Sequence, residues 1–203
     1  VYKRQYLLLI LSSLKKIKHF NMKSRHFLLV FLLQVVAISV QAARVDTVFV
    51  KSPSMNKDIK VVYILPDKTM AEHPQACPVI YLLHGYSGNA RSWIGLKPEL
   101  PQIADEKGII FVCPDGKNSW YWDSPKNPAY RYETFISSEL VNYTDTHYAT
   151  SPEKRARAIS GLSMGGHGAL WNAIRHKDIF GAAGSMSGGV AVSYTHLRAH
   201  ETD

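Results

Sequence analysis

The chain has 203 residues, of which 46% are hydrophobic and 20% charged, and its formal net charge is +8. Seven lysines and arginines but no acidic residue precede residue 43, whereas residues 43–191 carry 16 basic and 14 acidic side chains, a net charge of +2. The net charge of residues 43–191 is therefore too small to indicate nucleic acid or an anionic membrane as a partner. Residues 43–191 can bury a core, but they fall short of the roughly 200 to 250 residues that single α/β domains often reach.

The two ends of the chain are related to each other as DNA. A DNA sequence that encodes residues 1–5 has a reverse complement that, in another frame, encodes residues 192–195. The run on to residue 202 resembles the translation of a transposase-type sequencing adapter. We expect residues 192–203 to be an adapter-like tail and residues 1–21 to be adapter-like sequence followed by untranslated leader. His196 and His200 are then no part of the natural protein.

A secretory signal peptide is predicted over residues 22–42. Lys23 and Arg25 follow Met22, an apolar run covers residues 27–40, and Val40 and Ala42 are small residues placed for cleavage before residue 43. The alternative is an uncleaved membrane anchor, for which the apolar run is shorter than the roughly 20 residues of a spanning helix. Cleavage predicts a secreted or periplasmic protein with no stable membrane span.

Apolar runs and turn residues predict the secondary structure after residue 43. Two strands rich in β-branched residues, with a turn at residues 56–58, form an antiparallel lead-in. Continuous apolar runs then predict strands that are buried on both faces. The predicted strands are residues 45–50, 59–65, 78–83, 109–113, 157–160 and 181–187, and the predicted helices are residues 99–107, 130–148 and 167–176. The alternation predicts a mostly parallel sheet with helices on both faces, whose site lies at the carboxyl ends of the strands.

Cys77 and Cys113 are the only cysteines. A secreted protein could join them, but they stand at opposite ends of two predicted parallel strands, farther apart than a disulfide allows. Both are expected to be small buried residues. No Cys/His spacing suggests zinc, and we expect neither a metal nor a cofactor.

The sequence GLSMG at residues 161–165 lies between a predicted strand and a predicted helix. Glycines on both sides of Ser163 suit a strand that turns directly into a helix, which lifts the serine hydroxyl above the sheet. This motif is the nucleophile elbow of an α/β-hydrolase, and it predicts that fold with Ser163 as the catalytic nucleophile. The N–H of Met164 is predicted to bind the oxyanion, and the N–H of Tyr86 to supply the second donor.

Other polar residues near the motif are assigned to structural roles. His84 is expected to brace its loop, with catalysis as the less favoured alternative, and His167 is expected to be structural. The remaining candidates are expected to be loop, cap and surface residues; they are Ser92, Asp115, Asp123 and Glu139.

Three motifs together resemble the esterase D family, which includes feruloyl and acetylxylan esterases, tributyrin esterases, S-formylglutathione hydrolases and the antigen 85 mycolyltransferases. They are LHGYSGN at residues 83–89, WYWDSP at 120–125 and GLSMGGHGAL at 161–170. The resemblance implies an α/β-hydrolase fold, Ser163 as nucleophile, and oxyanion donors at Tyr86 and Met164. It also implies that the loop around Trp120 and Tyr121 lines the acyl or leaving-group pocket, with simple aromatic packing as the alternative.

The expected activity is hydrolysis of a small-molecule or carbohydrate ester through an acyl-enzyme. In this fold an Asp or Glu and then a His follow the nucleophile along the chain. We expect residues 43–191 to be the N-terminal portion of one domain that lacks both partners, and therefore to be inactive alone. Two alternatives remain, an acyltransferase of the antigen 85 type and a non-catalytic carbohydrate-binding protein. The export signal makes a thioester detoxifying enzyme of the reducing cytosol less favoured.

Overall fold

The computed structural model describes residues 43–189. The expected leader and adapter-like residues 1–21, the signal peptide 22–42 and the tail 192–203 lie outside the described residues. None of the helices within residues 43–189 is long and apolar enough to cross a membrane.

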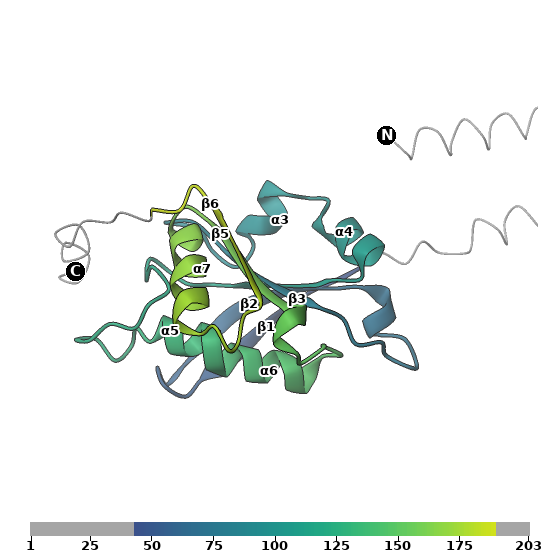
Figure 1. Cartoon of the computed structure of the whole chain (residues 1–203), viewed down its shortest axis with the longest axis horizontal. Helices are drawn as coiled ribbons and strands as arrows, with labels where there is room; N and C mark the ends of the chain where they lie inside the picture. Colours follow the sequence, from purple (N-terminus) through teal and green to yellow (C-terminus); the bar gives the residue numbers. More distant parts are fainter. Residues whose placement is uncertain (1–42, 190–203) are drawn as a thin grey trace, which may run out of the picture. The chain divides into compact units, whose positions relative to one another are not determined.

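Six strands form one sheet in the order β1-β2-β4-β3-β5-β6. Their bounds are β1 Arg44–Ser52, β2 Lys57–Leu65, β3 Val79–Leu83, β4 Ile110–Pro114, β5 Arg157–Leu162 and β6 Ala182–Met186. β1 pairs with β2, and β2 with β4, in antiparallel fashion, whereas β4, β3, β5 and β6 run parallel. The predicted antiparallel lead-in and parallel sheet are both confirmed (Figure 1).

The hairpin between β1 and β2 is tighter than predicted. The strand already begins at Lys57, which pairs with Ser52, so the turn lies before it and not at residues 56–58. Asn56 has a φ of 49°. Asparagine tolerates this left-handed conformation better than most residues, which lets the chain reverse within a short turn.

Helices cover both faces of the sheet. One face packs on α3 (Ser92–Leu96) and α4 (Leu100–Lys107), through Trp93, Leu100 and Ala104. The other face packs on the helical segment of α5, η3 and α6 and on α7 (Met164–Arg175). In Figure 1, α3 and α4 accordingly lie on the opposite side of the sheet from α5 and α6. Two short 3-10 turns, η2 (Asp67–Thr69) and η4 (Lys154–Ala156), complete the described elements.

The long helix predicted over residues 130–148 is interrupted by a wider turn. It consists of α5 (Tyr132–Thr134), a π-helical turn η3 (Phe135–Glu139) and α6 (Leu140–His147). Such π turns insert a residue into the helical ladder, which shifts the side-chain faces on either side of it. Helix α4 ends at Lys107, as predicted, and Gly108 follows it with a left-handed φ of 62°. Helix α7 begins earlier than predicted, directly after Ser163.

Cys77 and Cys113 are both free and buried. Cys77 precedes β3, and its backbone forms an isolated β-bridge with Thr150. Cys113 lies near the end of β4, opposite Val62. Their placement at opposite ends of neighbouring parallel strands agrees with the arrangement expected from the sequence.

Candidate active site

Ser163 occupies a one-residue turn between a strand and a helix. β5 ends at Leu162 and α7 begins at Met164. Ser163 has a φ of 54° and a ψ of −116°, its N–H donates to the carbonyl of Met186 at 2.8 Å, and its side chain is exposed. A positive φ is strained for a serine, and such strain persists only where the surrounding structure enforces it. The hydroxyl therefore lies at the carboxyl edge of the sheet.

The two glycines of the GLSMG sequence lie where the backbone comes closest. A Cβ on Gly161 would overlap the main chain of Gly165, and a Cβ on Gly165 would overlap the carbonyl groups of Leu83 and His84. The obstacles are backbone atoms, which cannot rotate away as a flexible side chain can. The sharp turn thus requires glycine at both positions, and this steric requirement explains the glycines on both sides of the GLSMG serine.

The loop after β3 lies against the serine. A Cβ on Gly85 would be 3.5 Å from the Cβ of Ser163 and 3.3 Å from the carbonyl oxygen of Leu162. Tyr86, the next residue, is therefore at the same edge of the sheet, and 47% of its surface is exposed. Met164 opens α7, where the first N–H groups have no acceptor within the helix. The fold thus brings all three predicted site residues to one edge.

His84 connects this loop to the next one along the edge. Its Nε2 is 2.9 Å from the N–H of Gly116, and its Nδ1 is 2.7 Å from the carbonyl of Gly85. Because an N–H must donate, Nε2 is the acceptor and Nδ1 carries the proton. The ring is neutral in this arrangement, so the approach of Asp115 Oδ1 to 3.7 Å is a contact with an uncharged ring. The geometry is that of a brace.

The loop that follows β4 is built from strained residues held by hydrogen bonds. Lys117, Trp120 and Tyr121 have φ values of 49°, 56° and 59°. The side-chain oxygen of Asn118 accepts the N–H of Ser87 at 2.8 Å, which ties this loop to the one that carries Tyr86. Non-glycine residues with positive φ cluster at active sites because they fix a loop in one shape.

Tyr121 and Trp120 differ in what they contact. Tyr121 is fully buried, packs against Gly168, and donates its hydroxyl to the carbonyl of His84 at 3.1 Å. These contacts make it a packing residue. Trp120 is half-buried and meets His167 edge to face, with ring centroids 5.4 Å apart. His167 Nδ1 is 2.8 Å from the carbonyl of Gly189, so this histidine is also engaged in holding the chain.

The other candidate residues have structural partners. Asp123 accepts the N–H of Thr134 at 3.0 Å and so caps the helical segment, in line with the loop and cap roles expected for this group of residues. Glu139 and Ser92 likewise accept hydrogen bonds from neighbouring turns. Asp115 is a buried loop residue directly after β4, and its carboxylate accepts hydrogen bonds from the N–H and the ammonium of Lys117.

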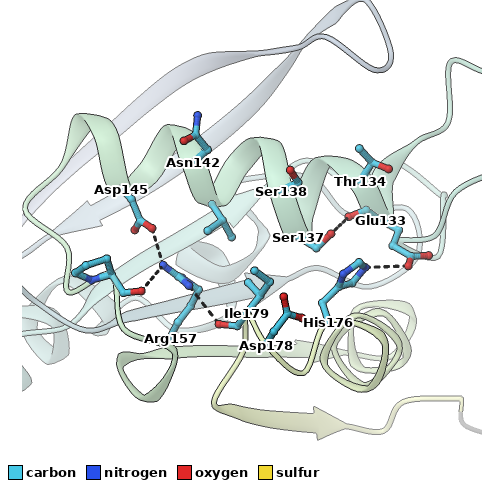
Figure 2. Close-up of a pocket in the computed structure, with 12 residues that line it drawn as sticks. Glu133, Thr134, Ser137, Ser138, Asn142, Asp145, Arg157, His176, Asp178 and Ile179 are labelled. Atoms are coloured by element: carbon cyan, nitrogen blue, oxygen red, sulfur yellow. Dashed lines mark hydrogen bonds and ion pairs between the residues drawn. The ribbon is translucent and has the colours of Figure 1, made fainter.

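A cavity of about 520 Å³, which the sequence did not predict, lies between the helical segment of α5, η3 and α6 and the end of α7 (Figure 2). Glu133 and His176 meet on one side of it, and Arg157 binds Asp145 on the other. His176 caps the far end of α7, about 18 Å from Ser163 for a helix of twelve residues. This cavity is therefore separate from the serine. The residues come from distant parts of the chain, and no local motif marks them.

A mostly parallel sheet with a strained serine at a strand-to-helix turn defines the chain as an α/β-hydrolase. The sequence profile of the family described as "Putative esterase" matches residues 52–199. The chain belongs to this esterase family of serine hydrolases.

Relatives differ in the reactions that their names state. An acetyl esterase of Caldicellulosiruptor saccharolyticus is 28% identical over 135 residues, which cover 64% of this chain and 50% of the relative. The diacylglycerol acyltransferase/mycolyltransferase Ag85A of Mycobacterium leprae is 33% identical over 162 residues, which cover 75% and 46%. A solved ferulic acid esterase matches with a TM-score of 0.66 and 29% identity, covering 75% of this chain and 60% of its own. The chain spans about half the length of the curated relatives it matches.

Proposed function

We propose that Ser163 is the nucleophile of a carboxylic-ester hydrolase that works through an acyl-enzyme. The observation that carries the proposal is the strained, exposed turn that presents the serine at the edge of the sheet. The serine oxygen attacks the ester carbonyl as a base takes its proton, and the alcohol leaves with that proton. Water then attacks the acyl-enzyme, which releases the carboxylic acid and restores the serine.

The negative charge of the tetrahedral intermediate needs donors that are already in place. The N–H of Met164 lies at the positive end of α7, where helix geometry leaves it without an acceptor. The N–H of Tyr86 follows Gly85, which touches the serine. We assign these two groups as the oxyanion donors. The brace from His84 to Gly116 would hold the second donor in position.

The base and its acidic partner belong, in this proposal, to sequence after residue 189. Between Ser163 and residue 189 the only histidines are His167 and His176 and the only carboxylate is Asp178. His167 is engaged by the carbonyl of Gly189, while His176 binds Glu133 at the far end of α7, where Asp178 also lies. Because nucleophile and base act as a unit, residues 43–189 alone should retain little activity.

The substrate we favour is an acetyl, feruloyl or related acyl ester of a carbohydrate. Support comes from the similarity to an acetyl esterase and to a ferulic acid esterase. The predicted signal peptide at residues 22–42 also supports this substrate, because a secreted or periplasmic enzyme would meet polymeric esters. A second candidate is acyl transfer to a sugar, favoured by the similarity to the M. leprae acyltransferase.

The test uses the uninterrupted gene product, with whatever sequence follows residue 189 in the gene. It should hydrolyse p-nitrophenyl acetate, and Ser163→Ala should lower kcat by at least a thousandfold. Ser138→Ala, which alters an exposed serine on η3, is the matched control and should leave kcat unchanged. Intact mass after mixing with substrate should show an added acyl group only when Ser163 is present. Equal activity of the wild type and Ser163→Ala would refute the assignment.

Added carbohydrate distinguishes hydrolysis from transfer. A hydrolase should release free acid at the same yield with or without a sugar acceptor, whereas a transferase should form a new sugar ester. A non-catalytic carbohydrate-binding protein would give neither product on a broad ester panel, and its gene would lack an Asp or Glu followed by a His after residue 189.

A further inference from the structure

A second cavity opens at the same edge of the sheet as Ser163, at the start of β2. Its volume is about 270 Å³, and its wall includes Lys57, Lys60, Lys117 and Tyr132. β2 is antiparallel to β4, so the first residues of β2 lie beside the carboxyl end of β4. With strands about 4.8 Å apart, the three steps from β2 across β4 and β3 to β5 place this cavity about 14 Å from the strand that leads into Ser163. A short oligosaccharide spans that distance.

The cavity wall holds three lysines and two carboxylates, Asp58 and Asp115, so its charges sum to a small positive excess. Within residues 43–189, neither Lys57 nor Lys60 forms an ion pair, while Lys117 pairs with Asp115 at 3.0 Å. Burial, and then the nearby Lys117 ammonium, lower the pKa of Lys57 below its ordinary value. Both effects penalise the charged amine, and a bound anion would relieve the repulsion.

A hydroxyl without a partner lies in the wall. Tyr132 is fully buried, and its hydroxyl has no hydrogen-bond partner among the described residues. Burial raises the pKa of this hydroxyl, which therefore remains a donor at neutral pH. A buried donor without an acceptor costs about 1–3 kcal/mol. The ammonium of Lys57 lies 4.9 Å from the centre of the Tyr132 ring and donates a hydrogen bond to the carbonyl of Ala129, so it stands over the ring beside the cavity.

An exposed aromatic ring, that of Phe49, forms part of the wall, and the ring of Tyr130 packs on Tyr132. Phe49 is 63% exposed, and the ammonium of Lys60 lies 5.6 Å from the centre of its ring. Tyr130 is 38% exposed and contacts the ring of Tyr132 edge to face. An exposed flat ring beside a cation suits a ligand that has both an apolar face and an anionic group, as a uronic acid has.

The loop after β4 contacts both this cavity and the loop that carries Tyr86. Asp115 and Lys117 line the cavity, whereas Gly116 donates to His84 and Asn118 accepts from Ser87. Alternate residues of one short loop therefore face the lysines and the loop of Tyr86. A group bound in the cavity would be held at a set position relative to the serine.

We infer that this cavity binds the carboxylate of a uronic acid on the carbohydrate whose ester Ser163 cleaves. The inference rests on the proposed function for its link to catalysis, but binding can be measured independently. Lys57 and Lys60 supply the charge, Tyr132 supplies a hydrogen bond, and Phe49 packs on the sugar ring. The site selects acidic over neutral polysaccharide esters.

The test is calorimetric titration of the uninterrupted gene product with a glucuronic-acid-substituted xylo-oligosaccharide that carries no ester. The probe is compared with the same oligosaccharide after reduction of its carboxylate to an alcohol. The acidic form should bind at least tenfold more tightly at low salt, and the difference should shrink as salt is added. Equal affinity for the two forms would overturn the inference.

Two variants and one control variant test the assignment of the site. Lys60→Gln should weaken binding of the acidic probe at least fivefold, and so should Tyr132→Phe, which removes only the hydroxyl and leaves the ring. Lys107→Gln, an exposed lysine at the opposite edge of the sheet, should change nothing. Loss of binding in Lys107→Gln as well, or in none of the three, would contradict the assignment.

Two further arms separate the possible failures. Inorganic phosphate that binds as tightly as the acidic sugar, with the same dependence on Lys60, would show a general anion site and overturn the uronate assignment. The binding measurement is repeated in Ser163→Ala, which cannot turn over an ester. Binding that persists there while the wild type hydrolyses no ester would refute the proposed function and leave the binding site standing.

Discussion

The Nε2 atom of His84 lies 2.9 Å from the main-chain nitrogen of Gly116. This contact joins the loop after β3 to the loop after β4, and it decides between two roles for a histidine close to the serine. A ring that accepts a backbone N–H at Nε2 and directs Nδ1 to the carbonyl of Gly85 has no free nitrogen with which to deprotonate Ser163.

Replacing His84 with alanine should therefore damage the fold more than the chemistry. The N–H of Gly116 would be left buried without an acceptor, at a cost of about 1–3 kcal/mol in the free energy of unfolding. Urea denaturation measures this loss, and His147→Ala, an exposed histidine on α6, is the control. A fall in kcat as large as that of Ser163→Ala, in a protein that remains folded, would identify His84 as the base.

Alanine at Gly165 should destabilise the fold. The added Cβ would overlap the carbonyl groups of Leu83 and His84, and both obstacles are backbone. Overpacking of this kind costs about 1–3 kcal/mol or more. The matched control is Gly95→Ala on α3, where nothing lies within 4 Å of the new Cβ. Helix propensity favours alanine there by about 1 kcal/mol, so thermal denaturation should show opposite signs for the two variants.

Glu133 links α5 to the end of α7 and should make stability depend on pH. Burial raises the pKa of its carboxyl, but hydrogen bonds from Arg175, Trp171 and His176 outweigh burial and leave the pKa below its ordinary value. A depressed pKa means that the ionised form stabilises the fold above the unfolded-state value, and that this contribution is lost as the pH falls toward the folded-state value.

Glu133→Gln should accordingly lower the free energy of unfolding by about 1–3 kcal/mol at pH 7. The difference from wild type should diminish in acid, below the ordinary pKa of a glutamate. Denaturation curves at pH 7 and at acidic pH measure both effects, with the exposed Glu106→Gln on α4 as the control. A difference that does not change with pH would contradict the role of the ionised carboxylate.

The two cysteines should resist thiol reagents while the protein is folded. Burial raises the pKa of Cys113 to about 12 and also raises that of Cys77. The thiolate is the reactive form, so neither residue supplies it near neutral pH. Titration with a disulfide reagent at pH 8 should show two thiols only after denaturant is added. Rapid reaction of either thiol in the native protein would disprove its burial.

The strands and the serine turn could be predicted because their signals are local. Continuous apolar residues predict β3 and β4, and glycines next to Ser163 predict a turn in which a side chain would strike backbone. The π turn at η3 has no such local signal, since the apolar spacing of residues 130–148 is that of an uninterrupted helix. The sequence allows Tyr121 either to line a pocket or to pack in the core, and its burial against Gly168 indicates packing.

The sequence alone determined the class of the protein and the identity of its candidate nucleophile. Both follow from residues close together in the chain, whose spacing is dictated by backbone sterics. Only the tertiary structure decided that His84 is neutral and engaged, that Glu133 holds three side chains, and that Lys57 lies over Tyr132. These contacts join segments far apart in the sequence, and the packing of loops and helices around the sheet, not any local pattern, brings them together.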